Sequence, residues 1–114
     1  MPLIASKKLN MNFNTLRIDF KTLAGEALSH SHVIINELLP TGKMSGSEWI
    51  ALNPLRKDKK LGSFSVNLTT GKWADFATGD GGGDLISLAA YLRRTSQMEA
   101  ALWLQGFFRI GGSR

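Results

Sequence analysis

Alternation of apolar and polar residues is clearest over residues 63–68, which is the pattern of a strand with one buried face. The Thr-Thr-Gly sequence that follows predicts a tight turn, with Gly71 in the left-handed conformation that glycine adopts without steric penalty. The chain then returns, so we expect a hairpin over residues 63–76. A looser alternation over 47–52 predicts a further strand, and together these strands predict a small antiparallel sheet.

Three segments place apolar residues three and four positions apart, as amphipathic helices do: 19–38, 84–94 and 97–105. Asp19 and Asp84 stand at N-cap positions of the first two, and Ser96 with Glu99 forms a capping box for the third. The glycine-rich segment 79–83 is expected to be a flexible passage from sheet to helix. The pattern therefore predicts an α+β fold with an N-terminal helix, a small antiparallel sheet and two C-terminal helices.

A chain of 114 residues with 43% apolar residues is enough for one domain with one core. We expect that domain over 16–106, with a flexible arm at 1–15 and a tail at 107–114. Cysteine is absent, and His30 and His32 diverge on the predicted helix, so neither a metal site nor another cofactor is expected. No segment has the roughly 20 apolar residues of a membrane span or the core of a signal peptide, so we expect a cytoplasmic protein.

Basic residues are concentrated in the loop before the hairpin, where four cations fall within five residues: Arg56, Lys57, Lys59 and Lys60. The net charge of +5 and the sequence pI near 9.9 favour polyanionic partners. A basic cluster suits phosphate contacts, because each neutralised phosphate releases counterions. On charge alone, a solvated loop without a ligand is the alternative.

Exposed aromatic rings are the second requirement for binding single-stranded nucleic acid, since each stacked base contributes about 1–3 kcal/mol. Trp73 and Phe76 lie three positions apart and therefore point to opposite faces of an extended strand. We expect Trp73 to face away from the core, because it shares its face with Asp75, which an apolar core accommodates poorly. A Trp73 covered by the N-terminal helix is the alternative. Other residues expected on or beside the binding face are Ser63, Ser65, Asn67, Lys43, Lys72 and, as a second ring, Trp49.

Four short motifs occur in a characteristic order: Asn53-Pro54-Leu55-Arg56, Gly62-Ser63-Phe64-Ser65-Val66, Asp75-Phe76-Ala77-Thr78-Gly79 and Gly83-Asp84. This order resembles the N-terminal zinc-binding domain of bacterial, phage and plasmid DNA primases, which has Cys-Pro-x-His, Pro-Ser-Phe-x-Val, Cys-Phe-x-Cys-Gly and Gly-Asp. The resemblance covers about residues 42–105. More narrowly, the chain resembles the cysteine-free version of this domain in primase-like proteins of mobile elements. The positions of the four zinc ligands hold other residues: Asn53, Arg56, Asp75 and Thr78.

The resemblance implies a zinc-ribbon-like fold without metal and a non-catalytic module that binds single-stranded template for DNA replication and primer synthesis. Stacking would come from Trp73 and Trp49, and phosphate contacts from Arg56, Lys57, Lys59, Lys60, Lys72 and Lys43. An ion pair between Arg56 and Asp75, with hydrogen bonds from Asn53 and Thr78, would join the loops that zinc joins in the relatives. If exposed, such a pair contributes about 0–1 kcal/mol.

Two other functions compete with this interpretation. The protein could dock on a primase, polymerase or helicase through the polar sheet face or the Phe107-Phe108 segment, without touching nucleic acid itself. It could also be a small nuclease, but the sequence contains no paired-acid motif and no histidine-based catalytic arrangement. We therefore expect a binding protein rather than an enzyme.

Overall fold

The computed structural model describes residues 18–57 and 62–107, which form an α+β fold as predicted. Its elements in chain order are α2 (Phe20–Ser29), α3 (Ser31–Leu38), β1 (Lys43–Ser45), β2 (Glu48–Ala51), β3 (Phe64–Asn67), β4 (Trp73–Asp75), β5 (Asp80–Gly82), α4 (Leu85–Arg93) and α5 (Gln97–Phe107). The five strands form one antiparallel sheet in sequence order, so each strand pairs with its neighbours along the chain.

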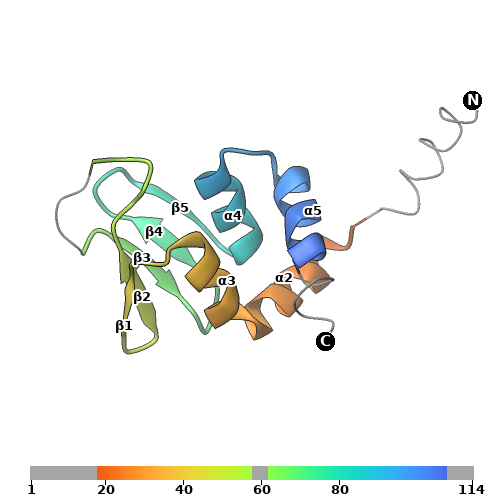
Figure 1. The fold of residues 1–114 in the computed structure, drawn as a ribbon, viewed down its shortest axis with the longest axis horizontal. Coiled ribbons are helices and arrows are strands. Elements are labelled where there is room, and N and C mark those ends of the chain that lie inside the picture. Colours follow the sequence, from red (N-terminus) through yellow and green to blue (C-terminus); the bar gives the residue numbers. More distant parts are fainter. Residues whose placement is uncertain (1–17, 58–61, 108–114) are drawn as a thin grey trace, which may run out of the picture.

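The helices gather on one side of the sheet, and the core lies between the two layers (Figure 1). Alternate residues of β2, β3 and β4 are buried, as expected for strands with one covered face. The strand register aligns Trp49 with Val66 and Trp73, and aligns Ala51 with Phe64 and Asp75. These six residues form the covered face, and the residues between them form the open face.

The predicted N-terminal helix is two helices, α2 and α3, that meet at His30. Side chains of the junction compete for the carbonyl oxygen of Glu26: the Ser29 hydroxyl donates to it at 2.8 Å, and His30 Nδ1 lies 3.0 Å from it. Local side-chain hydrogen bonds of this kind favour a helix end over a continuous ladder. The break turns α3 relative to α2, and both helices contact α4.

The predicted caps are present. Asp19 accepts from the Thr22 amide at 3.1 Å, Asp84 accepts from the Ser87 amide at 2.8 Å, and the Ser96 and Glu99 capping box closes in both directions. Each bond satisfies a donor that the first turn of a helix leaves without a partner.

Helix α5 runs two residues beyond the predicted 97–105, to Phe107, whose ring stacks on Trp103 at 5.6 Å. Burial of an aromatic surface extends the helix beyond the predicted end. The arm at 1–15 and residues 108–114 lie outside the described residues.

The hairpin over 63–76 is confirmed, with Gly71 at φ +85° in the turn. Segment 79–83 was expected to be a flexible passage, and this was wrong: residues 80–82 form β5 and pair with β4. A Cβ at Gly82 would lie 2.6 Å from Trp73 Nε1, so the glycine permits close approach of the indole. Among the described residues, no helix has both the length and the apolar character that crossing a membrane requires.

Candidate functional site

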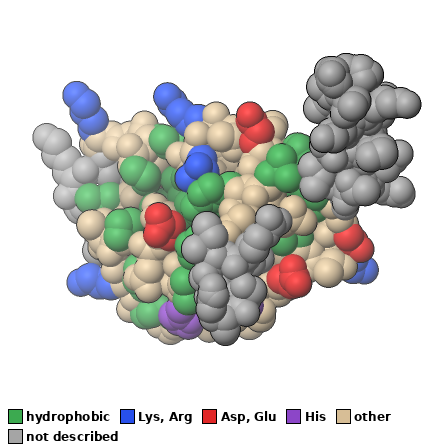
Figure 2. Space-filling model, turned by 45° about the vertical axis from the view of Figure 1, so that its right-hand side comes forward, with side chains coloured by type: hydrophobic (Ala, Val, Ile, Leu, Met, Phe, Trp, Pro, Cys, Tyr) green, Lys and Arg blue, Asp and Glu red, His purple; other side chains and the backbone are tan. Residues whose placement is uncertain are grey.

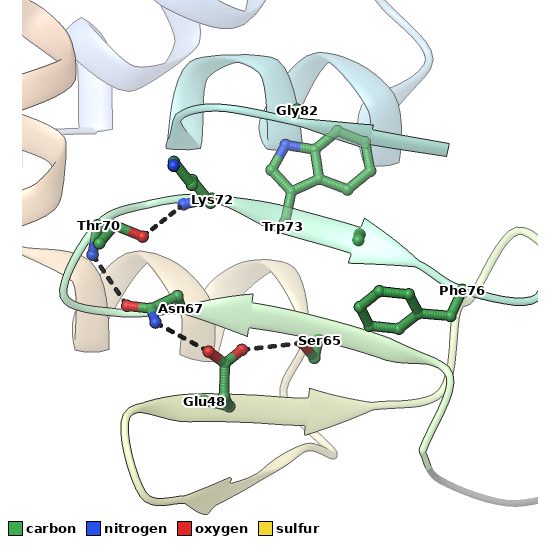
Figure 3. A pocket seen from close by; sticks show the side chains of 9 residues that line it. Glu48, Ser65, Asn67, Thr70, Lys72, Trp73, Phe76 and Gly82 are labelled. Atoms are coloured by element: carbon green, nitrogen blue, oxygen red, sulfur yellow. Dashed lines mark hydrogen bonds between the residues drawn. The ribbon is translucent and has the colours of Figure 1, made fainter. Parts of the chain in front are cut away.

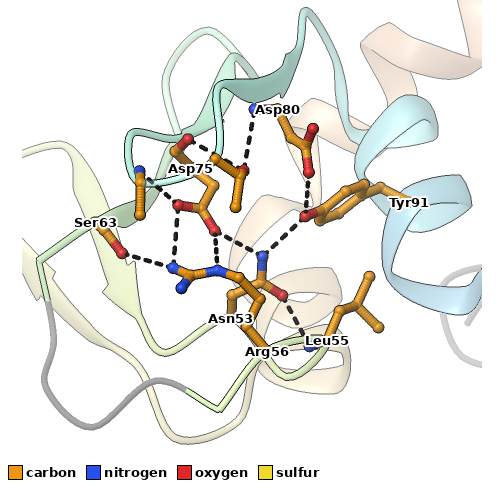
Figure 4. A network of polar contacts seen from close by, with 9 residues as sticks. Asn53, Leu55, Arg56, Ser63, Asp75, Asp80 and Tyr91 are labelled. Carbon is orange, nitrogen blue, oxygen red and sulfur yellow. Dashed lines mark hydrogen bonds and ion pairs between the residues drawn. The ribbon is translucent and has the colours of Figure 1, made fainter.

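Of the four positions that the sequence resemblance singled out, Asn53 and Arg56 meet at the carboxylate of Asp75 (Figure 4). Arg56 makes the predicted ion pair in two-pronged form, with Nε 3.0 Å from Oδ2 and a terminal nitrogen 3.2 Å from Oδ1. Asn53 Nδ2 donates to Oδ2 at 2.8 Å, and the Ala77 amide donates to Oδ1 at 2.9 Å. Thr78 bonds the Asp75 backbone carbonyl rather than the carboxylate. The network thus joins the loop after β2 to the end of β4.

Burial sets this ion pair apart from an exposed one. Asp75 is 0% exposed, whereas the Arg56 side chain is 31% exposed. Burial alone would raise the pKa of Asp75, but hydrogen bonds from Asn53, Ala77 and Arg56, together with the charge of Arg56, outweigh it and lower that pKa. The four hydrogen bonds occupy the acceptor sites of a carboxylate, so the ionised form is fully satisfied in the core.

Tyr91 and Asp80 extend the network to α4 and β5, which sequence reasoning did not include. The Tyr91 hydroxyl accepts from Asn53 Nδ2 at 2.9 Å and donates to Asp80 Oδ2 at 2.8 Å. Burial, followed by the hydrogen bond and charge of Asp80, raises the pKa of Tyr91. Every buried side-chain nitrogen and oxygen of the described residues has a hydrogen-bond partner, and no three potential metal-ligating side chains converge there. The network therefore joins the loop after β2, strands β4 and β5, and helix α4 through hydrogen bonds.

The expectation that Trp73 faces away from the core was wrong. Trp73 is 6% exposed, lies 4.7 Å from the Tyr91 ring and donates from Nε1 to the Ser87 hydroxyl at 2.9 Å. It shares the covered face with Asp75 because Arg56 and Asn53 satisfy the carboxylate there. Tyr91 and Ser87 of helix α4 contact it, and Phe64 of β3 lies 6.1 Å away between ring centroids.

Trp49 is likewise buried at 8% exposure, and its Nε1 donates to the Leu39 carbonyl at 3.0 Å. Neither tryptophan presents a ring face on which a base could stack.

The exposed ring beside the sheet is instead Phe76, at 74% exposure. Its amide pairs with the Ser63 carbonyl, so strand alternation places Phe76 on the open face with the predicted polar residues Ser65 and Asn67. A shallow depression of about 440 Å³ lies on this face, and Figure 3 shows Phe76 near one end of it and Lys72 near the other. The alternation of a hairpin could have identified Phe76, because residues 72, 74 and 76 share a face with 63, 65 and 67.

Glu48 also lines the depression, and sequence reasoning missed it. Its Oε1 accepts from the Ser65 hydroxyl at 2.9 Å, and its Oε2 accepts from Asn67 Nδ2 at 2.8 Å. Pairing of Lys43 with Ile50 places Lys43 on the open face, as expected, and Lys72 lies opposite Asn67. The open face therefore combines one ring, one carboxylate, two lysines and small polar side chains.

The predicted basic residues do not form one surface in the described part of the chain. Arg56 is part of the Asp75 network, Lys57 is exposed, and Lys59 and Lys60 lie outside the described residues. Figure 2 shows lysine and arginine side chains at separate places on one face, with acidic side chains between them. The described residues include seven lysines and arginines and eight aspartates and glutamates. The remaining residues include seven lysines and arginines but one aspartate. The excess of positive charge thus belongs to segments 1–17, 58–61 and 108–114.

Comparison with known proteins adds no relative: no protein-family model matches the sequence, and no curated protein matches it.

Proposed function

We propose that this protein is a non-catalytic module that binds single-stranded DNA on the open face of its sheet, for DNA replication by a mobile-element primase in the cytoplasm. The observation that carries the proposal is the ring of Phe76, 74% exposed beside a depression that Lys72 borders. Aromatic platforms beside cations are what sequence-tolerant binding of single strands requires. The primase-like motifs over 42–105 support replication as the setting.

Small neighbours leave room for a base on Phe76. Ala74 pairs with Ser65, and both side chains lie on the open face between Phe76 and the Glu48 carboxylate. A flat base can therefore contact the ring and the sheet at once, without displacing a large side chain. Stacking on such a ring accepts any base, because every base has a π face.

Phosphate attraction would come from Lys43 and Lys72 on this face, from Lys57, and from the basic residues of the other segments, including Lys59 and Lys60. The described residues carry one more negative than positive charge, so they supply little long-range attraction of their own. We therefore expect a base to stack on Phe76, and we expect the salt dependence of the affinity to come largely from lysines outside the sheet.

Fluorescence anisotropy with a labelled single-stranded oligonucleotide, at low and high salt and with duplex competitor, tests the proposal. We expect salt-sensitive binding that prefers single strands, and Phe76→Ala should weaken it about tenfold, through loss of one stacked base. Leu102→Ala is the matched control, because it removes an exposed apolar side chain from α5 instead. Equal affinities of the Phe76→Ala variant and the unaltered protein would contradict the assignment of Phe76.

The double substitution Lys59→Ala and Lys60→Ala tests the phosphate role of the basic loop. It should lower affinity about equally for all sequences and flatten the dependence of affinity on salt. An unchanged salt slope would remove these two lysines from the proposal.

A protein-docking role is the second candidate, with a primase, polymerase or helicase as the partner. It is favoured by β1, an edge strand of the sheet whose three residues are all exposed, because an edge offers backbone groups to a partner strand. Absence of DNA binding at low salt, together with co-purification of a replication protein that substitutions in β1 abolish and Phe76→Ala does not, would favour this candidate.

A further inference from the structure

Glu48 holds a pair of acceptor atoms in place on the open face. Each carboxylate oxygen accepts one hydrogen bond along the sheet, from Ser65 or from Asn67, at 2.9 and 2.8 Å. Figure 3 shows the carboxylate between these two donors, in the depression that Phe76 and Lys72 also line. A carboxylate has about four acceptor sites, so each oxygen keeps one for a ligand.

The turn at the end of the hairpin fixes the orientation of this carboxylate. Asn67 Oδ1 accepts from the amides of Thr69 and Thr70 at 2.8 and 2.9 Å, which directs its Nδ2 toward Glu48. The side chain of Glu48 is therefore ordered before a ligand arrives. Preorganised groups bind more tightly, because less conformational freedom is lost on association.

Guanine is the base that matches two adjacent acceptors. Its Watson–Crick edge has neighbouring donors at N1 and N2, whereas adenine and cytosine offer one amino group beside a ring acceptor, and thymine places N3–H between two carbonyls. These edges are free in a single strand. We infer that Glu48 makes the depression selective for guanine in single-stranded DNA, an inference that rests on the proposed function and gives it a base preference.

The guanine and the stacked base would belong to different nucleotides. Glu48 pairs with Asn67, and Phe76 lies opposite Ser63, four residues away along β3. At the rise of a strand, this separates the two sites by about 13 Å in the strand direction, and they also lie two strands apart across the sheet. One strand of DNA would thus stack on Phe76 and place a guanine at Glu48.

Anisotropy with three sets of oligonucleotides tests the inference: all-thymidine dodecamers, the same chains with two separated guanosines, and the same chains with inosine or adenosine at those places. Inosine lacks the N2 amine, and adenosine controls for the stronger stacking of purines. The guanosine chain should bind at least about fivefold more tightly than the inosine chain, from loss of one bond of a two-bond contact.

Glu48→Gln should bring the guanosine-to-inosine affinity ratio close to one, because the amide replaces one acceptor with a donor. Glu37→Gln removes the same charge from an exposed position of α3 and should leave the ratio unchanged. Thermal denaturation checks that both variants fold. If Glu48→Gln does not fold, the comparison of guanosine with inosine on the unaltered protein decides the question.

The outcomes separate this inference from the proposed function. Binding of all chains with equal guanosine and inosine affinities would overturn the role of Glu48 and leave single-stranded DNA binding intact. A ratio that persists in Glu48→Gln would also overturn it. Failure of every chain to bind at low salt would overturn both.

Discussion

The two faces of the sheet each carry an aromatic ring and a carboxylate, but in different surroundings. On the covered face, Trp73 packs on Tyr91, and Asp75 accepts four hydrogen bonds from Asn53, Arg56 and Ala77. On the open face, Phe76 is exposed, and Glu48 accepts two hydrogen bonds from neighbouring strands. Residue type alone therefore does not indicate which face is buried. The number of protein hydrogen-bond donors to each carboxylate does indicate it.

The difference follows from what a buried charge needs. A carboxylate away from water costs several kcal/mol unless protein donors replace the water molecules it loses. Asp75 has those donors because the loop after β2 brings Arg56 and Asn53 beneath the sheet. Glu48 keeps acceptor sites free of protein donors, so these sites can accept hydrogen bonds from a ligand. The acceptor sites of Asp75 are all occupied by protein donors, and those hydrogen bonds stabilise the fold.

The sharpest test of the comparison is to truncate one ring on each face. Trp73→Ala should lower the free energy of unfolding by about 3–5 kcal/mol, because it leaves a cavity among Phe64, Tyr91 and α4. Phe76→Ala should change it by less than about 0.5 kcal/mol, since the ring is largely in water. Urea denaturation followed by circular dichroism measures both. Similar losses from the two variants would mean that the faces are not distinct.

The second test replaces the carboxylate on each face by an amide. Asp75→Asn should cost about 2–3 kcal/mol of unfolding free energy, less than for a fully buried pair because Arg56 keeps partial access to water. Glu48→Gln, the matched change on the open face, should cost less than about 1 kcal/mol. Urea denaturation of both variants at neutral pH provides the measurement, and equal costs would contradict the special status of Asp75.

Acid should weaken the covered face through Asp75. Its folded pKa is lowered, so its stabilisation is complete above the unfolded value of about 3.9 and is lost as the pH falls through the folded pKa. Unfolding free energies measured from about pH 6 down to about pH 2 should fall less steeply for Asp75→Asn than for the unaltered protein. Asp19, whose pKa the Thr22 amide lowers, titrates in the same direction and retains part of the slope.

Much of the fold was predictable because its signals are local. The turn of the hairpin with its left-handed Gly71, both aspartate caps and the capping box depend on residues within four positions of each other. Strands β1 and β5 were missed because each has three residues, and β5 contains two glycines that ordinarily indicate a loop. Gly82 is needed there for contact with Trp73, which no local pattern reveals.

Two predictions about Asp75 have different outcomes in the structure. Judged alone, its charge placed it with Trp73 on the solvent side; judged by the primase-like motifs, it belonged in an ion pair with Arg56. The ion pair is present, and it is the reason that Asp75 can be buried. Hydrogen bonds from Asn53 and Arg56, which are distant in sequence, allow the polar Asp75 to be buried. Trp73 is therefore buried with it, and Phe76 is exposed instead.

The smallest expected effect on stability comes from the lysines of the open face. Lys43→Ala with Lys72→Ala should change the unfolding free energy by less than about 0.5 kcal/mol, because both side chains are exposed. If each lysine contacts one phosphate, the slope of log affinity for single-stranded DNA against log salt should become shallower by about 1.4. Lys21→Ala on α2 is the control, since that lysine is exposed on the helical side and should leave the slope unchanged. An equal slope for the double variant and the unaltered protein would mean that DNA does not cross the open face between Lys43 and Lys72.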